Sequence, residues 1–179
     1  ITGDVIISDA RYYLINSNKT YDYIVLDVFN GDTTPGHILS VEALQILKTR
    51  MTQKGILAVN LAGSLKKETF MTASVIKTLE SVFKTVEIYP LFSLDNSEGW
   101  GNLAVIAYDY PSIPLKLSRV KNFPVHPLAR DLVSRLADQR FSFPSDTPAI
   151  ILSDDYNPID FYDIWLKEKV RKVDVKRVI

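Results

Sequence analysis

The chain has 179 residues, enough for one domain with a substantial core, and 46% of them are hydrophobic while 23% are charged. Its 21 basic and 21 acidic side chains give a formal net charge of zero, which argues against nucleic acid as the main partner. The absence of cysteine excludes a disulfide framework and a thiolate metal site.

Two further features bound the class of protein. The two histidines lie far apart and make no recognisable metal motif, so we expect no metal site. No apolar run approaches the roughly 20 residues of a membrane span, and no signal-peptide pattern is visible. We therefore expect a soluble, cytoplasmic protein that binds neither membrane nor nucleic acid.

The first residues predict a strand followed by a helix. The chain starts at Ile1 without an initiator methionine, which suggests a piece of a longer protein, and Val5–Ser8 is a short apolar stretch typical of a buried strand. Asp9 is placed to cap a helix that runs to about Asn16, because its carboxylate can accept from the first-turn amides.

The stretch Tyr21–Val28 is predicted to be the central strand of a parallel sheet, because it is apolar on both faces. Asp27 falls near its carboxyl end, and a polar loop from Asn30 to Gly36 follows. Ligands in open α/β sheets bind outside the carboxyl ends of strands, so Asp27 is the first candidate for chemistry. An aspartate that caps a helix or orders the loop is the alternative.

Further along, helices alternate with strands, which implies parallel pairing through right-handed crossovers. Two final strands without a helix between them predict an antiparallel hairpin at one edge. The fold class is therefore α/β, a mostly parallel sheet with an antiparallel edge hairpin. The expected elements are helix Ser40–Met51 with Ser40 as N-cap, strand Ile56–Leu61 released by Lys54-Gly55, a helix from a loop at Ala62–Ser64 to about Phe83, strand Thr85–Tyr89, a loop with an exposed Trp100, and strand Asn102–Tyr108.

After Asp109 the chain becomes richer in proline and predicts a helical extension, so we divide it into residues 1–109 and a packed extension, residues 110–179. Pro127 can start a helix that contains Leu128–Leu136. Asn157 and Pro158 form a strong helix start. The face made by Phe161, Ile164 and Trp165 is predicted to pack in the core, and the basic tail Lys167–Arg177 to be solvated.

Several short motifs, in order, resemble the spermidine/spermine synthase (aminopropyltransferase) group and its relatives, which share the S-adenosylmethionine-dependent methyltransferase fold. No single motif is specific to this group, and the resemblance rests on the order and spacing of all of them. The motifs are Ser8–Leu14, Tyr21–Phe29, Pro35–Ser40 with Glu42-Ala43, Gly55–Asn60, and Leu152–Pro158, which resembles a Thr/Ser-Asp-Asp-x-x-Pro motif.

The resemblance implies roles for individual residues. Asp9 and Ala10 would contact the adenine of decarboxylated S-adenosylmethionine or S-adenosylmethionine, and Asp27 would orient and deprotonate the attacking amine. Asp32 and His37 are the candidate substrate-binding residues. The synthases carry a second aspartate where this chain has Asn30, which leaves polyamine specificity open.

The resemblance also implies that a Gly-rich strand and loop, and the acidic residue that holds the ribose, precede Ile1 in a longer protein. We therefore expect aminopropyl transfer to a small amine in the intact protein, and weak adenosyl-ligand binding by this chain alone. A methyltransferase of the same fold and a non-catalytic remnant are the alternatives. The unpaired edge of Tyr21–Val28 is expected to pair with Val5–Ser8, or else with a second copy of the chain.

Overall fold

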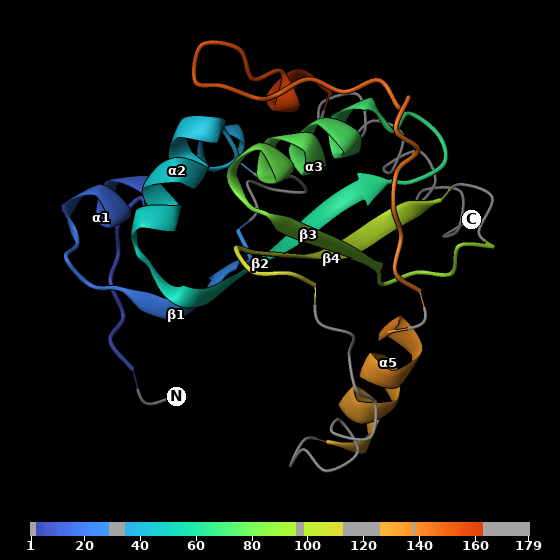
Figure 1. The fold of residues 1–179 in the computed structure, drawn as a ribbon, viewed down its shortest axis with the longest axis horizontal. Coiled ribbons are helices and arrows are strands. Elements are labelled where there is room, and N and C mark those ends of the chain that lie inside the picture. The colour runs from blue at the N-terminus through green and yellow to red at the C-terminus, as the bar shows by residue number, and fades with distance from the viewer. Residues whose placement is uncertain (1–2, 29–34, 96–98, 113–125, 138, 163–179) are drawn as a thin grey trace, which may run out of the picture.

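The computed structural model describes residues 3–28, 35–95, 99–112, 126–137 and 139–162 (Figure 1). Within them, a four-stranded sheet has the order β1-β2-β4-β3. Helices α2 and α3 lie on one face of this sheet, and α1 packs beside α2 (Figure 1). The elements are α1 (Ala10–Asn16), β1 (Tyr21–Leu26), η1 (Gly36–Ile38), α2 (Val41–Thr49), β2 (Met51–Ser64), α3 (Phe70–Val82), β3 (Thr85–Pro90), β4 (Trp100–Tyr108) and α5 (Pro127–Ala137).

The α/β prediction is confirmed, and the sheet is mixed. β1 pairs in parallel with β2, and β4 runs antiparallel to both β2 and β3. The predicted antiparallel pair of the last two strands is therefore present. This pair lies at one edge of the sheet as predicted, with β3 outermost and β4 between β3 and β2.

The hydrophobic core lies between the sheet and the two helices α2 and α3. Alternate residues of β2 and β4 point toward the helices and are buried, which is the period-two pattern of a strand with one covered face. The inward faces of α2 and α3 complete this core, which stabilises the sheet chiefly by removing apolar surface from water. Its members include Leu44, Leu47, Leu57, Val59, Leu61, Val75, Ile76, Leu79, Leu103 and Val105.

Removing one methylene group from this core should cost a small, measurable amount of stability. Ile76 of α3 is 4% exposed, and we expect Ile76→Val to lower the free energy of unfolding by about 0.5–1.5 kcal/mol. The matched control is Ile15→Val in α1, because Ile15 is 51% exposed. Urea denaturation that shows equal effects for the two variants would contradict the assignment of the core.

Local capping signals place the helix starts correctly. Asp9 caps α1, and its side chain accepts a hydrogen bond from the backbone N–H of Tyr12. Ser40 caps α2 and accepts from the N–H of Ala43. Both predicted N-caps are thus confirmed.

The predicted end of α2 is wrong, because the helix stops at Thr49 and β2 begins at Met51. Gly55 lies within β2, beside an irregular pairing in which Tyr21 is opposite Met51 while Tyr23 is opposite Ile56. A Cβ added at Gly55 would lie 3.0 Å from the Cβ of Met51. The glycine therefore serves close packing in a bulged strand.

The predicted loop Ala62–Ser64 is also wrong, because these residues continue β2 and α3 begins at Phe70. They pair with Trp100–Asn102 of β4, which extends the ladder beyond the apolar run. Trp100, expected to be exposed, is partly buried in β4. Cross-strand pairing thus overrides the small-residue turn signal.

The stretch that carries Asp27 is not a central strand in this chain. β1 lies at the edge of the sheet, and no described residue pairs with its free side. Tyr23 and Val25 are 73% and 67% exposed, so the strand is not buried on both faces as predicted. Val5–Ser8 forms no strand, and the exposed fractions of Val5 and Ile7 are 87% and 99%. The prediction that Val5–Ser8 pairs with the free edge of this strand is therefore wrong.

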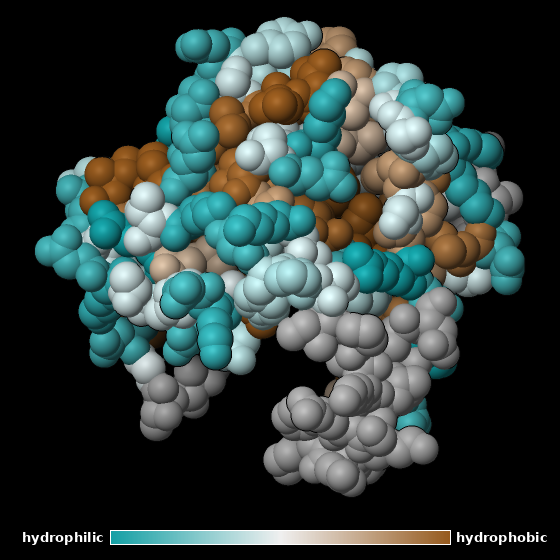
Figure 2. Space-filling model, viewed as in Figure 1, coloured by the Kyte–Doolittle hydropathy of each residue, from teal (hydrophilic) through white to brown (hydrophobic). Residues whose placement is uncertain are grey.

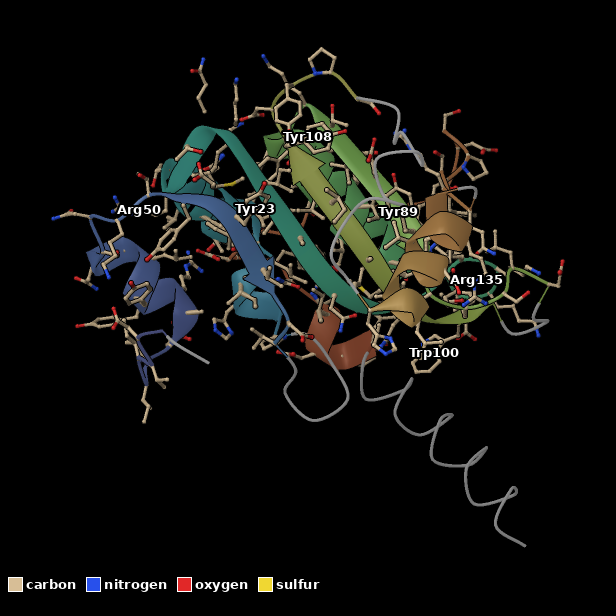
Figure 3. The ribbon with its side chains drawn as sticks, turned by 90° about the horizontal axis from the view of Figure 1, so that it is seen from below. Tyr23, Arg50, Tyr89, Trp100, Tyr108 and Arg135 are labelled. Atoms are coloured by element: carbon tan, nitrogen blue, oxygen red, sulfur yellow. The ribbon has the colours of Figure 1, made fainter. Side chains whose placement is uncertain are left out.

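The face of the sheet turned away from α2 and α3 is only partly covered. Figure 3 looks onto this face, on which Tyr23 of β1 and Tyr89 of β3 are labelled. α5 lies on this side, near β3, and begins at Pro127 as predicted. Figure 2, viewed at a right angle to Figure 3, shows that apolar atoms also reach the surface at the α1 end of the molecule. The part of the chain that the structure describes has no helix long and apolar enough to cross a membrane.

On this partly covered face, a buried carboxylate joins β3, β4 and the segment after α5. Glu87 is 8% exposed and accepts hydrogen bonds from the hydroxyls of Tyr89 and Tyr108, both at 3.0 Å, and of Ser112 at 2.6 Å. Arg140 lies 3.1 Å from the same carboxylate. Burial alone raises the pKa of Glu87, but the three hydrogen bonds and the charge of Arg140 outweigh it and hold the pKa below its ordinary value.

The last described helix begins where the sequence predicts. The side-chain oxygen of Asn157 accepts from the N–H of Ile159 at 3.3 Å, and residues 159–162 are helical. Phe161 was expected in the core but is 74% exposed, so that prediction is wrong. Ile164, Trp165 and the tail Lys167–Arg177 lie outside the described residues.

Candidate functional site

The carboxyl end of β1 presents a carboxylate held by the neighbouring strand. Asp27 directly follows β1 and is exposed, and the pairing of Leu26 with Val59 brings Asn60 of β2 beside it. The side-chain N–H of Asn60 donates to Asp27 Oδ1 at 2.9 Å, so one carboxylate oxygen is fixed. The Oδ1 atom of Asn60 is buried without a hydrogen-bond partner among the described residues.

Asn60 was not identified as a site residue from the sequence. Its signal was present, because it is the one strongly polar side chain in the apolar run Ile56–Leu61. Its meaning depended on the strand register, since only parallel pairing of β1 with β2 puts Asn60 opposite Asp27. The amide supplies a donor to a carboxylate that would otherwise rely on water for its orientation.

A second carboxylate, Asp9, lies at the start of α1. Its Oδ1 accepts from the N–H of Tyr12 at 2.8 Å, and its Oδ2 lies 2.9 Å from Nε2 of His37. The hydrogen bond from Tyr12 and then that from His37 lower the pKa of Asp9 below its ordinary value. The structure thus brings together two of the predicted site residues. Asp9 was expected to contact the adenine of the sulfonium cofactor, and His37 was expected to bind the substrate.

The start of α1 lies beside the carboxyl end of β1. Ala10 and Leu26 line one small cavity together with Ile38 of η1. Because Asp9 precedes Ala10 and Asp27 follows Leu26, both carboxylates lie near the carboxyl end of β1. Asp32 lies outside the described residues.

The described residues contain no group of three His, Cys, Asp or Glu side chains placed to hold a metal ion. What they offer is two acidic side chains, each partly fixed by a neighbour and each reachable from solvent. Carboxylates of this kind can accept protons from an amine and can attract a cationic ligand.

The helix-covered mixed sheet has the α/β fold that spermidine synthase structures share. A crystal structure of spermidine synthase in complex with the transition-state analogue AdoDATO has a TM-score of 0.57 with this chain and 15% identity, over 75% of this chain and 47% of that one. At this identity the similarity shows the shared fold.

Two curated proteins are similar to parts of the sequence. The N-terminal histidine N-methyltransferase of Emericella nidulans is 35% identical over 89 residues, which is 47% of this chain and 16% of that protein. The polyamine aminopropyltransferase of Vibrio vulnificus is 36% identical over 55 residues, which is 29% of this chain and 18% of that protein. The chain thus spans less than a fifth of either relative. No model of a known protein family matches it.

Proposed function

We propose that this chain forms the acceptor side of a transferase that moves an alkyl group from a sulfonium carbon to an amine nitrogen. The observation that carries this proposal is Asp27 at the carboxyl end of β1, held by Asn60. The names of both curated relatives agree with it, since each describes transfer of an alkyl group to nitrogen.

A carboxylate in this position suits the chemistry. The lone pair of a neutral amine attacks the carbon beside the sulfur, the carbon–sulfur bond breaks, and its electrons leave with the sulfur as a neutral thioether. The new ammonium group then loses a proton. Asp27 would take that proton, or remove one earlier from the ammonium form, and Asn60 would keep its oxygen aimed at the nitrogen.

We further propose that the transferred group is aminopropyl and the donor decarboxylated S-adenosylmethionine, used by an intact protein that contains this chain. Asp9 and Ala10 would then contact the adenine, while Asp32 and His37 would contact the amine. Residues 110–179 would form an extension packed on the unit made by residues 1–109. The position of α5 near β3 supports this division.

Methyl transfer from S-adenosylmethionine is the second candidate, because the relative with the longer matched stretch is an N-methyltransferase. To separate the two, the intact protein would be incubated with a panel of small amines and each donor in turn, and the product mass measured. Aminopropylated product with the decarboxylated donor alone supports the first proposal. Methylated product supports the second, and no product with either donor would indicate a non-catalytic remnant.

The exposed edge strand leads to a prediction about assembly. We infer that the chain self-associates through β1, because no described residue pairs with its free edge, and exposed apolar side chains at such an edge favour pairing with another chain. Val25→Lys should shift the elution of a concentrated sample from oligomer to monomer. Leu128→Lys in α5 is the control, because Leu128 is 73% exposed but lies away from β1. Equal elution of both variants would contradict the inference.

A further inference from the structure

Residues 149–158, here named the strap, run from α3 to the start of α2. At the α3 end, the strap N–H groups of Ile150 and Leu152 donate to Ser74 Oγ at 3.1 Å and to Thr78 Oγ1 at 2.9 Å. Both hydroxyl residues and Leu152 are fully buried. Figure 1 shows the strap in orange beside α3. This end is therefore fixed firmly to the core.

The other end of the strap holds the residues that precede α2. The carbonyl of Leu152 accepts from the N–H of Val41 at 2.8 Å, and the side-chain N–H of Asn157 donates to the carbonyl of Gly36 at 2.7 Å. Ser40, the N-cap of α2, donates its hydroxyl proton to Asp154 Oδ1 at 2.5 Å. The segment 36–41 is thus attached to the strap at three points.

Asp154 also binds α1. The two terminal nitrogens of Arg11 donate to its two oxygens, at 2.7 and 2.5 Å, in a bidentate pair. The same guanidinium donates to the backbone carbonyl of His37 at 3.2 Å. The hydrogen bonds from Arg11 and then Ser40 lower the pKa of Asp154 to about 2, so the carboxylate is charged at neutral pH.

These contacts form a continuous connection to the candidate site. Arg11 lies two residues after Asp9, and it holds the backbone of His37, whose ring binds the Asp9 carboxylate. The Asp9–His37 contact is itself exposed, with 50% and 54% of the two side chains accessible, and such a contact fixes little alone. Asp154, in contrast, joins three separate segments through one charged group.

We propose that Asp154 is a positioning residue, which acts through Arg11 and Ser40 to hold the start of α1 and the segment 36–40 in the arrangement that pairs Asp9 with His37. Both oxygens of Asp154 are already occupied by protein donors, so it orders the site and does not itself take the ligand. The inference rests on the proposed function only for what Asp9 and His37 bind.

The test compares Asp154→Asn with Asp155→Asn, because Asp155 is the adjacent exposed acid. The first readout is the NMR signal of the histidine rings. The chain has two histidines, so the ring of His126, which directly precedes α5, is the internal reference. We expect Asp154→Asn to move the His37 ring signals and leave those of His126 unchanged, and Asp155→Asn to move neither.

A second readout is hydrogen exchange at the N–H of Val41. Loss of charge-assisted hydrogen bonds should speed it by about tenfold or more in Asp154→Asn, and less than twofold in Asp155→Asn. Arg11→Lys keeps the positive charge but removes the bidentate geometry, so it should move the His37 signals in the same direction. If Asp154→Asn does not fold, the His37 signals of Arg11→Lys test the positioning role in its place.

Unchanged His37 signals in both Asp154→Asn and Arg11→Lys would overturn the positioning role, whatever the protein catalyses. In the intact protein, the role predicts a rise of several-fold in KM for the donor with a smaller change in kcat. If the His37 signals move but neither variant nor wild type transfers any group, the positioning role stands and the proposed function fails. The two failures are therefore distinguishable.

Discussion

Replacing Asp27 with asparagine is expected to reduce kcat for alkyl transfer by about 10²–10⁴-fold, the usual contribution of a general base. Asparagine keeps the size of the side chain and can still contact Asn60, but it cannot accept a proton at neutral pH. The measurement is the initial rate of amine alkylation by the intact protein with saturating donor.

Asp22→Asn is the matched control for this variant. Asp22 is an exposed acid at the other end of the same strand, where it accepts from Thr52 Oγ1 at 2.7 Å. Its replacement should leave kcat within about twofold, since surface substitutions away from a site have small effects. Equal losses in both variants, or full activity of Asp27→Asn, would exclude Asp27 as the base.

Replacing Glu87 with leucine is expected to lower the free energy of unfolding by about 3 kcal/mol, because it leaves three hydroxyl donors, of which that of Tyr108 is buried, without their shared acceptor. The donors are the hydroxyls of Tyr89, Tyr108 and Ser112. Arg140 is 43% exposed and can turn to water, which keeps the loss at the lower end of the range for a broken buried pair. Glu87→Gln retains an acceptor and should lose less. An equal or higher stability of Glu87→Leu in urea denaturation would contradict this account of the cluster.

The contribution of Glu87 should also depend on pH. Its folded-state pKa is lower than the ordinary value of 4.5, so folding favours the charged form. The stability it adds is therefore fully present above the ordinary value and is lost as pH falls through the folded-state pKa. The stability difference between wild type and Glu87→Gln should be constant from about pH 7 to pH 5 and should narrow below about pH 4.5. A difference that widens on acidification would contradict the sign of the shift.

The correct sequence predictions depended on local physics. Asp9, Ser40 and Asn157 cap helices because each side chain satisfies amides within three residues of itself. The α/β class was predicted for a similar reason. Apolar residues recur with one spacing in helices and another in strands, so each element can be read from its own residues. The position of Asp27 at the carboxyl end of β1 was also predicted, because a polar loop follows the apolar run that contains it.

The incorrect predictions depended on which segments become neighbours. The apolar composition of Tyr21–Val28 indicated a strand covered on both faces. Burial, however, depends on other segments that pack against the strand, and the composition of the strand does not reveal them. Gly55 reads equally as a helix stop and as a bulge glycine, and strand register decides between them. Asp154 lies 143 residues from Arg11, so no local pattern could reveal their pairing.

The most direct test of the proposed function is a crystal structure of the intact protein with S-adenosylhomocysteine and an amine acceptor bound together. We expect the acceptor nitrogen within about 2.6–3.2 Å of a carboxylate oxygen of Asp27, the distance for direct proton transfer. We also expect the adenine amino group to contact Asp9. An acceptor nitrogen bound away from the carboxyl end of β1, with Asp27 facing solvent, would contradict the assignment of this edge as the transfer site.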